Sequence, residues 1–283
     1  KNTVPWETWS SNKKITGFVW SKTPSTISKT AMMDNVHIAM WSGPRNISSA
    51  MMRSFENRPD TTVTDEPFYA HYLLKTGVQH PLRKEIIQNS ECNFYNIVTC
   101  LTGSIPDKKK IWYQKHMAHH NLPGMDIHWT KNITNCFLIR HPKEVILSYE
   151  KRFHIDNIDQ LGYKQLCILF EYLKKETGKS PLVLDSRDVL NHPREILNKL
   201  CDKIGISFMD QMLSWPSGRR ISDGMWGQHW YKNVEDSTGF QKYQEKNKKL
   251  PDKLLSLYKE CLSYFDKLYL HRIRPQKQPE ENG

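Results

Sequence analysis

The sequence of 283 residues lacks any long hydrophobic run. No stretch approaches the ~18 apolar residues that a membrane-spanning helix requires, so no membrane partner is expected. Residues 1–34 are polar and contain no apolar segment of the kind found in a secretory signal. No CxxC pair occurs, and the six cysteines are scattered, which is typical of reduced thiols rather than of a disulfide or zinc framework. These absences together predict a cytoplasmic protein.

The composition is that of a folded protein with an excess of positive charge. Apolar residues make up 38% of the chain and aromatic residues 11%, which excludes a disordered or collagen-like protein. There are 41 Lys and Arg against 30 Asp and Glu, a formal net charge of +11. Such a charge indicates an anionic partner, which could be nucleic acid, an acidic membrane surface or a multiply charged nucleotide. Charge alone does not choose among them.

Short apolar runs alternate with amphipathic segments along most of the chain. The first run, Val36–Trp41, ends at Ser42-Gly43-Pro44 and has the length and boundaries of a buried strand. Strands separated by helices form parallel sheets covered by helices on both faces. The sequence therefore predicts an α/β fold with three layers and a central parallel sheet of about five strands. The other four predicted strands are at 61–64, 111–114, 136–139 and 182–184, and helices are expected at 47–57, 67–76, 143–152, 159–177, 193–204 and 251–270.

The same pattern predicts the organisation of the chain. Residues 1–33 show no sustained periodicity and are interpreted as an N-terminal extension. Residues 34–273 carry the alternating pattern and are interpreted as one domain, while residues 274–283 form a polar tail. No internal repeat is evident.

The segment after the first predicted strand has the features of a phosphate site. It reads Ser42-Gly43-Pro44-Arg45-Asn46-Ile47-Ser48-Ser49 and leads into a predicted helix. A helix start offers free backbone N–H groups and the positive end of its dipole, while Arg and Ser add further donors. An ordinary turn with a serine cap explains the same residues about equally well. It is not a Walker A loop, because no Lys precedes the serines.

A second candidate anion site follows the fourth predicted strand. Arg140 stands at the end of that strand, Pro142 is placed to begin a helix, and Ser148 lies two turns into it. Arg140 and Ser148 can both contact one phosphate only if the helix folds back across the crevice at the strand ends. The alternative is an arginine in surface ion pairs, which is a common outcome.

Histidines gather at the end of the third predicted strand, in Lys115-His116-Met117-Ala118-His119-His120. A histidine at this edge of a parallel sheet is well placed for acid–base chemistry. His116 and His120 are four residues apart and would share one face of a helix. No HExxH pattern is present, so no metal site is expected.

Together these segments resemble the sulfotransferases that use 3′-phosphoadenosine-5′-phosphosulfate (PAPS). Residues 44–49, Pro-Arg-Asn-Ile-Ser-Ser, are similar to the 5′-phosphosulfate loop of that family, Pro-Lys-Ser-Gly-Thr-Thr. Arg140 and Ser148 reproduce the eight-residue spacing of its 3′-phosphate motif. Lys115-His116 stands where the cytosolic branch carries its catalytic histidine. The similarity covers roughly Val36 to Ile206, with a weaker match at 217–220.

The resemblance implies a PAPS-dependent sulfotransferase that releases 3′,5′-adenosine bisphosphate. Lys115 would stabilise the leaving oxygen, and the base would be His116, with His120 beside it, or Glu66, because other branches use a Glu after the second strand. The acceptor would be a small molecule with a hydroxyl, amine or guanidine group, near the aromatic residues 226–231. The implied cofactor-binding residues are Gly43, Pro44, Arg45, Asn46, Ser48, Ser49, Arg140, Ser148, Gly218, Arg219 and Arg220.

Two other functions are compatible with parts of the sequence. A nucleotide or small-molecule kinase would share the fold and bind ATP with Mg²⁺, but the lysine of its phosphate loop is missing. A non-catalytic protein that binds nucleic acid or another anion would explain the net charge. Such a protein predicts Lys and Arg clustered with aromatic residues on one surface. The basic residues are instead spread along the chain, so no nucleic-acid partner is expected.

Overall fold

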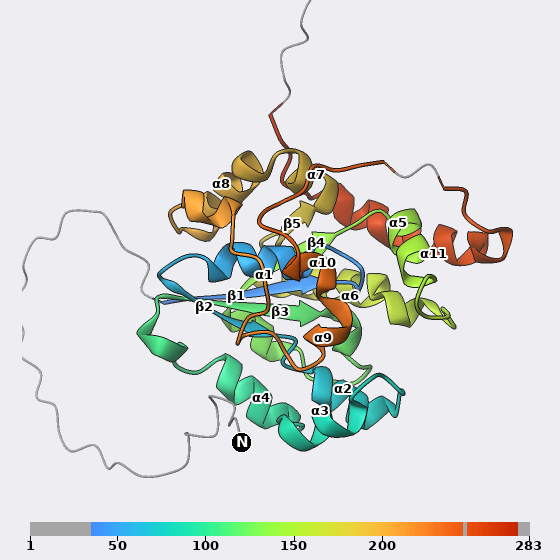
Figure 1. Ribbon diagram of the computed structural model, residues 1–283, viewed down its shortest axis with the longest axis horizontal. Helices are drawn as coiled ribbons and strands as arrows, with labels where there is room; N and C mark the ends of the chain where they lie inside the picture. The colour runs from blue at the N-terminus through green and yellow to red at the C-terminus, as the bar shows by residue number, and fades with distance from the viewer. Residues whose placement is uncertain (1–34, 246–247, 277–283) are drawn as a thin grey trace, which may run out of the picture. The chain divides into compact units, whose positions relative to one another are not determined.

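The computed structural model describes residues 35–245 and 248–276. The predicted N-terminal extension and residues 277–283 of the predicted tail lie outside this part. Five parallel strands form a sheet in the order β2-β3-β1-β4-β5 (Figure 1). This confirms the predicted α/β fold with a central parallel sheet. The strands are β1 (Val36–Ser42), β2 (Thr61–Asp65), β3 (Ile111–Met117), β4 (Thr134–Ile139) and β5 (Leu182–Asp185).

Both faces of the sheet are buried, because its strands are apolar at successive positions. In β1, Ile38 and Met40 point into one core, while Ala39 and Trp41 point into the other. This is the alternation that strand geometry imposes on neighbouring side chains. A strand with apolar residues on both faces needs helices on both sides, which explains the three layers.

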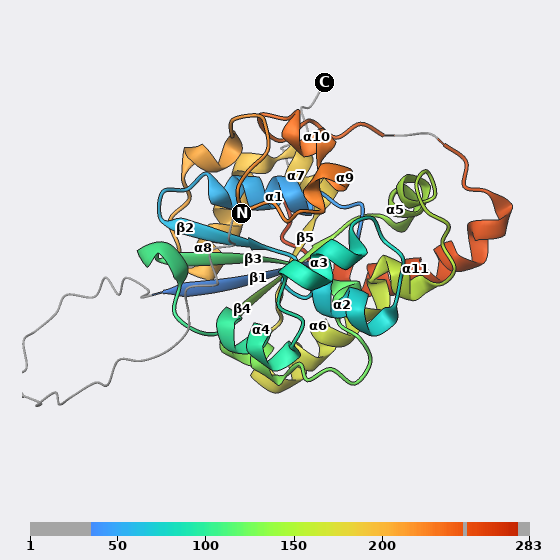
Figure 2. The same ribbon diagram turned by 60° about the horizontal axis from the view of Figure 1, so that its bottom comes forward.

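The helices divide between the two cores. Figure 2 shows α1, α7 and α8 on one side of the sheet and α4 and α6 on the other; α5 and α11 share a core with α4 and α6. On the first side are α1 (Ser48–Glu56), α7 (Ser186–Asn191) and α8 (Pro193–Ile204). On the second are α4 (Phe94–Leu101), α5 (Pro142–Tyr149), α6 (Tyr163–Thr177) and α11 (Leu255–Tyr269).

A smaller apolar cluster lies outside the two main cores. Tyr69, Leu73 and Ile86 pack there with Trp226 and Tyr231, which come from a segment far along the chain. The four helices that contribute to it or flank it are α2 (Tyr69–Thr76), α3 (Arg83–Asn89), α9 (Gly227–Trp230) and α10 (Lys232–Glu235). The short 3₁₀ helices are η2 (Pro106–Lys108), η3 (Ala118–His120), η4 (His128–Asn132), η5 (Ile158–Leu161), η6 (Asp210–Leu213) and η7 (Asp252–Leu254).

The topology brings two of the predicted motifs together. β1 lies between β3 and β4, and the chain runs from β1 toward one edge of the sheet and from β4 toward the other. In open parallel sheets, ligands bind at such a switch point, beyond the carboxyl ends of the strands. The segments after β1 and β4, which contain Arg45 and Arg140, are therefore neighbours.

Candidate functional site

A cavity of about 490 Å³ opens at the carboxyl edge of the sheet. Its lining includes the loop after β1, Glu66 after β2, Lys115 in β3, and Arg140 with α5. The segment that carries α9 and α10 lies beyond the ends of β1 and β3 (Figure 1) and contributes Trp230 and Tyr231. Residues from four strand ends thus meet in one space.

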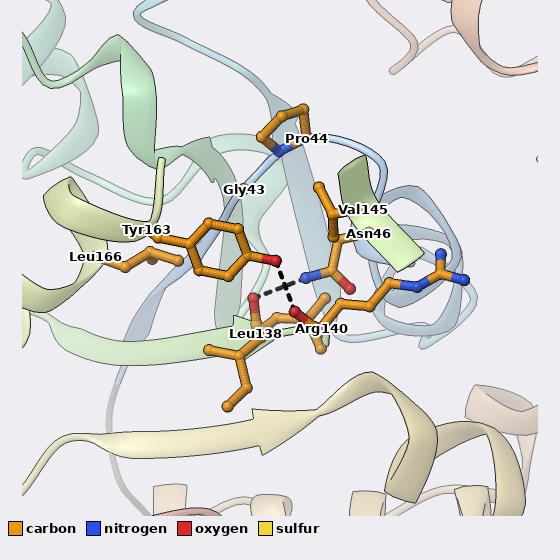
Figure 3. A pocket seen from close by; sticks show the side chains of 9 residues that line it. Gly43, Pro44, Asn46, Leu138, Arg140, Val145, Tyr163 and Leu166 are labelled. Carbon is orange, nitrogen blue, oxygen red and sulfur yellow. Dashed lines mark hydrogen bonds between the residues drawn. The ribbon is translucent and has the colours of Figure 1, made fainter. Parts of the chain in front are cut away.

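The loop after β1 is fixed tightly against β4. Arg45 has a left-handed backbone (φ 56°), a conformation that non-glycine residues adopt rarely and mostly at functional sites. The Asn46 amide donates to the carbonyl oxygen of Leu138 at 2.9 Å (Figure 3). A Cβ at Gly43 would lie 2.5 Å from the Leu161 carbonyl oxygen, so only glycine allows this approach. Gly43 itself lines a small separate cavity of about 10 Å³.

The two predicted anion motifs contact each other directly. One guanidinium nitrogen of Arg140 donates to the carbonyl oxygen of Arg45 at 3.0 Å, and Nε of Arg45 donates to Oγ of Ser148 at 3.0 Å. Tyr163, at the start of α6, donates its hydroxyl to the Arg140 carbonyl oxygen at 2.7 Å. The Arg140 guanidinium points away from the small cavity near Tyr163 (Figure 3). Arg45, Ser148 and Arg140 also line the large cavity.

Positive charge dominates the lining of the cavity. Burial lowers the pKa of Arg45, and repulsion from Arg152 and Arg140 lowers it further. Arg140 and Arg152 therefore both lie close enough to Arg45 to repel its charge. Among the described residues of the lining, two side chains are acidic, Glu66 and Glu144. Its basic side chains are Arg45, Lys115, Arg140, Lys143, Lys151, Arg152, Lys242 and Lys248.

A segment that the sequence did not single out borders the arginine end of the cavity. Residues 239–244 line it, and the Tyr243 hydroxyl donates to Glu144 at 2.7 Å. Glu144 also pairs with Arg140 at 2.8 Å. Burial would raise the pKa of Glu144, but the bonds from Tyr243 and Arg140 lower it overall. Glu144 is thus an ionised partner that holds Arg140 at the cavity wall.

Gly218, Arg219 and Arg220, expected to close over the nucleotide, do not line the cavity. Their loop is held against α1 instead, because the backbone N–H of Arg220 donates to Asp223 at 2.8 Å. Asp223 in turn forms a buried ion pair with Arg53 of α1 at 2.6 Å. Segment 239–244, and not 218–220, thus lines the arginine end of the cavity in this structure.

Charged groups from β2, β3 and α9 form a compact buried cluster at the other end. Lys115 Nζ lies 2.8 Å from Asp65, 2.6 Å from Glu66 and 2.6 Å from the Tyr231 hydroxyl oxygen. Tyr231 also donates to Asp65 at 2.7 Å. Glu66, like Arg45, follows its strand with a positive φ (43°). Lys115 and Tyr231 thus hold the Glu66 carboxylate in a fixed position at the cavity wall.

The environment of this cluster shifts the titration of its members. Burial alone would lower the pKa of Lys115, but Asp65 and Glu66 raise it well above its usual range. Burial raises the pKa of Glu66, against the opposing effect of Lys115. A carboxylate with a raised pKa is a stronger base than an ordinary Glu, and its pKa lies closer to neutral pH.

The structure places His116 away from the cavity. Its ring is 1% exposed, stacks on Trp41 at 4.3 Å between centroids, and does not line the cavity. Its Nε2 lies 3.3 Å from Gln114 Oε1. Burial and, to a smaller extent, the charge of Lys115 together lower its pKa to about 3. His120 does line the cavity, so of the predicted catalytic residues Glu66, Lys115 and His120 meet there and His116 does not.

The buried imidazole of His116 should make the fold sensitive to acid. The pKa of His116 is about 3 in the folded state and ~6.5 in the unfolded state. Its contribution to the free energy of unfolding is therefore fully present above pH ~6.5. This stabilisation is lost as pH falls toward 3. We expect His116→Asn to reduce the loss of unfolding free energy between about pH 7 and pH 4 by about 2–3 kcal/mol. Urea unfolding at both pH values measures this change in unfolding free energy. The same pH dependence in the variant and the wild type would contradict the conclusion that His116 is buried in its neutral form.

Of the aromatic residues expected near the acceptor, Trp230 and Tyr231 line the cavity and Trp226 does not. Trp226 is 7% exposed and packs edge-on against Tyr69, so its role is structural. Tyr69, His80 and Phe153 are further aromatic residues of the lining. None of these three is marked by a motif in the sequence.

Within residues 35–245 and 248–276, no group of three or more His, Cys, Asp or Glu side chains is arranged to hold a metal ion. No helix in the same ranges combines the length and hydropathy needed to cross a bilayer.

Comparisons with known proteins agree with this geometry. The sequence model of the sulfotransferase domain family matches residues 36–262. Two curated proteins of Arabidopsis thaliana, branched-chain-amino-acid aminotransferase-like proteins 2 and 1, are 32% and 34% identical over 239 and 235 residues. These matches cover 84% and 83% of this chain but only 42% of each plant protein. The chain therefore spans less than half the length of these relatives.

A solved structure shares the fold. The sulfotransferase domain of the olefin synthase from Synechococcus PCC 7002 aligns with a TM-score of 0.54 and 14% sequence identity. The alignment covers 90% of this chain and all of that domain. At this identity the similarity concerns the arrangement of the sheet and its helices.

Proposed function

The chain belongs to the sulfotransferase family, and we propose that it transfers a sulfuryl group from PAPS to a small-molecule acceptor. The proposed acceptor atom is a hydroxyl oxygen or an amine or guanidine nitrogen. The proposal rests chiefly on one observation: Arg45 and Arg140, at the ends of adjacent strands, line the same cavity.

The residues present suit a nucleotide with phosphate groups at both ends. The 5′-phosphosulfate would bind Arg45 and the start of α1, where Ser48 and Ser49 offer hydroxyl and backbone donors. The 3′-phosphate, with about −1.5 to −2 charges at neutral pH, would bind Arg140 and Ser148. The repulsion of Arg45 by Arg140 supports this, because an anion bound near both side chains would relieve it. PAPS supplies an activated sulfuryl group with a good leaving group.

Glu66 is the proposed general base. Its carboxylate lines the cavity, while the alternative, His116, is shielded by Trp41. Glu66 would take the acceptor's proton as the acceptor atom forms its bond to sulfur. The bond from sulfur to the phosphate oxygen breaks in the same step, and that oxygen keeps the electron pair. Arg45 would stabilise the charge that develops there, and Lys115 would hold Glu66 in place.

Transfer of radiolabelled sulfate from PAPS to a panel of alcohols, phenols and amines tests the proposed function. We expect labelled product with at least one acceptor class, release of 3′,5′-adenosine bisphosphate and no requirement for Mg²⁺. ATP hydrolysis or phosphoryl transfer that depends on Mg²⁺ would favour a kinase instead. If the protein binds an oligonucleotide but does not bind adenosine bisphosphate, a nucleic-acid-binding function is favoured instead.

A further inference from the structure

The cavity extends beyond Arg45 and Arg140, the side chains that the proposed cofactor would contact. The side chains that line its far end contact one another, from the neighbourhood of Glu66 to Trp230. Tyr69 lies one helical turn after Glu66, and its hydroxyl oxygen is 2.8 Å from Nδ1 of His80. The His80 ring lies 6.0 Å from Phe153 and 6.5 Å from Trp230, and Phe153 lies 5.1 Å from Trp230. These side chains form the acceptor end of the cavity, a wall suited to a flat ring.

Two neutral histidines add hydrogen-bonding capacity at this end. His119 and His120 both line the cavity, and Nδ1 of each is buried without a hydrogen-bond partner among the described residues. Burial lowers the pKa of His119 to about 3 and that of His120 well below its ordinary value, so both rings are neutral. A buried polar atom left unpaired costs free energy, which a polar group on a ligand would recover.

The charge at the acceptor end is positive. Arg152 lies beside Phe153 in the turn after α5, lines the cavity and repels Arg45. Its guanidinium donates to the carbonyl oxygen of His229 at 2.9 Å, and among residues 35–245 and 248–276 no carboxylate forms an ion pair with it. Lys151 lines the same end.

The carboxylates at this end already have partners within the protein. Asp65 and Glu66 both contact Lys115 and Tyr231, and Asp65 does not line the cavity. Among the described residues, Glu66 is therefore the one acidic side chain that lines this end, and it is held by Lys115. An amine or guanidine acceptor, which the sequence left open, would place its charge beside Arg152 and Lys151.

We propose that the acceptor is an anion: a small aromatic hydroxyl compound whose carboxylate binds Arg152. Its ring packs against Phe153 and Trp230, its hydroxyl faces Glu66, and polar groups on it pair with His119 or His120. This inference rests on the proposed function, because the hydroxyl must reach a bound sulfuryl donor.

Three matched phenols test the inference: phloretate, phloretamide and tyramine. They share a phenol ring and a two-carbon chain that ends in a negative, neutral or positive group. A charge-assisted hydrogen bond contributes about 1.5 kcal/mol or more, so we expect wild-type kcat/KM to be ~10-fold or more higher for phloretate than for phloretamide. Tyramine should be the poorest acceptor.

The Arg152→Gln variant tests the residue itself. It should lower kcat/KM for phloretate by ~10-fold, mainly through KM, and leave phloretamide within about threefold. Arg194→Gln is the matched control, because Arg194 is exposed, pairs with Asp210 and lines no described cavity. The Arg194→Gln variant should leave kcat/KM unchanged for both phloretate and phloretamide.

Failure of the inference about the acceptor can be distinguished from failure of the proposed function. The inference is overturned if phloretamide or tyramine equals phloretate, if Arg152→Gln leaves the preference intact, or if none of the three is sulfated while adenosine bisphosphate binds. If adenosine bisphosphate does not bind and no acceptor is sulfated, the proposed function itself fails, and this inference fails with it.

Discussion

Replacing Glu66 with Gln is expected to lower turnover by ~10²–10⁴-fold, the usual effect of removing a positioned general base. Gln keeps the size of the side chain and an oxygen that can accept from Lys115, so the surrounding cluster should persist. Affinity for 3′,5′-adenosine bisphosphate should stay within about threefold of wild type. Steady-state sulfate transfer gives the first quantity, and calorimetric titration gives the second.

His116→Asn is the matched control, since this imidazole is the other candidate base. Because His116 is shielded from the cavity by Trp41, we expect its variant to keep turnover within about tenfold of wild type. The reverse pattern, an inactive His116 variant and an active Glu66 variant, would assign the base to the histidine.

The pH profile gives an independent readout on Glu66. A base must be ionised to act, so kcat should rise with pH through the pKa of Glu66, which burial raises above its ordinary value. The Glu66→Gln variant should lose this rise.

Replacing Arg140 with Gln is expected to weaken the binding of adenosine bisphosphate by about 2–4 kcal/mol, roughly 30- to 1,000-fold. The change removes a charged partner of the proposed 3′-phosphate and leaves Glu144 facing it unneutralised. It also removes the bond to the Arg45 carbonyl oxygen, so the folded state of the variant must be checked by thermal unfolding. Adenosine bisphosphate titration is the measurement.

Arg140→Lys separates charge from geometry. Lysine keeps the charge but loses the planar fork that binds two oxygens at once, so an intermediate loss of affinity is expected. Arg187→Gln is the control for general charge, because Arg187 pairs with Tyr243 and lies near Glu144 but does not line the cavity. Equal losses for Arg140→Gln and Arg187→Gln would indicate a diffuse field rather than a phosphate contact.

Much of the fold could be predicted because its signals are local. Several strands contain a short apolar run that ends at a polar residue, as at Val36–Ser42, and β2 is marked by its β-branched residues. Helix starts were marked as well: Pro142 begins α5 and Pro193 begins α8. The order of the strands has no local signal, because it depends on how connections cross the sheet. The adjacency of the segments after β1 and β4 therefore came from the family resemblance and from the structure.

The site was predictable where its residues follow strands and much less so elsewhere. Arg45, Glu66 and Arg140 each follow a strand, and a parallel sheet gathers such positions at one edge. His116 does not line the cavity because it lies within β3, where alternate side chains point into a core. Tyr243 carries no motif. Arg152 had one usable signal, since it lies four residues after Ser148, one helical turn further along the chain.

The central claim is that Arg45 and Arg140 bind the two ends of one nucleotide. Calorimetric titration with 3′,5′-adenosine bisphosphate, 5′-AMP and 3′-AMP tests it most directly. If both phosphate positions are real, the bisphosphate should bind ~10- to 150-fold more tightly than either monophosphate, because each charged contact contributes about 1.5–3 kcal/mol. Arg140→Gln should then weaken 3′-AMP and leave 5′-AMP unchanged. Equal affinity for all three nucleotides would show that the two arginines do not bind one ligand and would contradict the account.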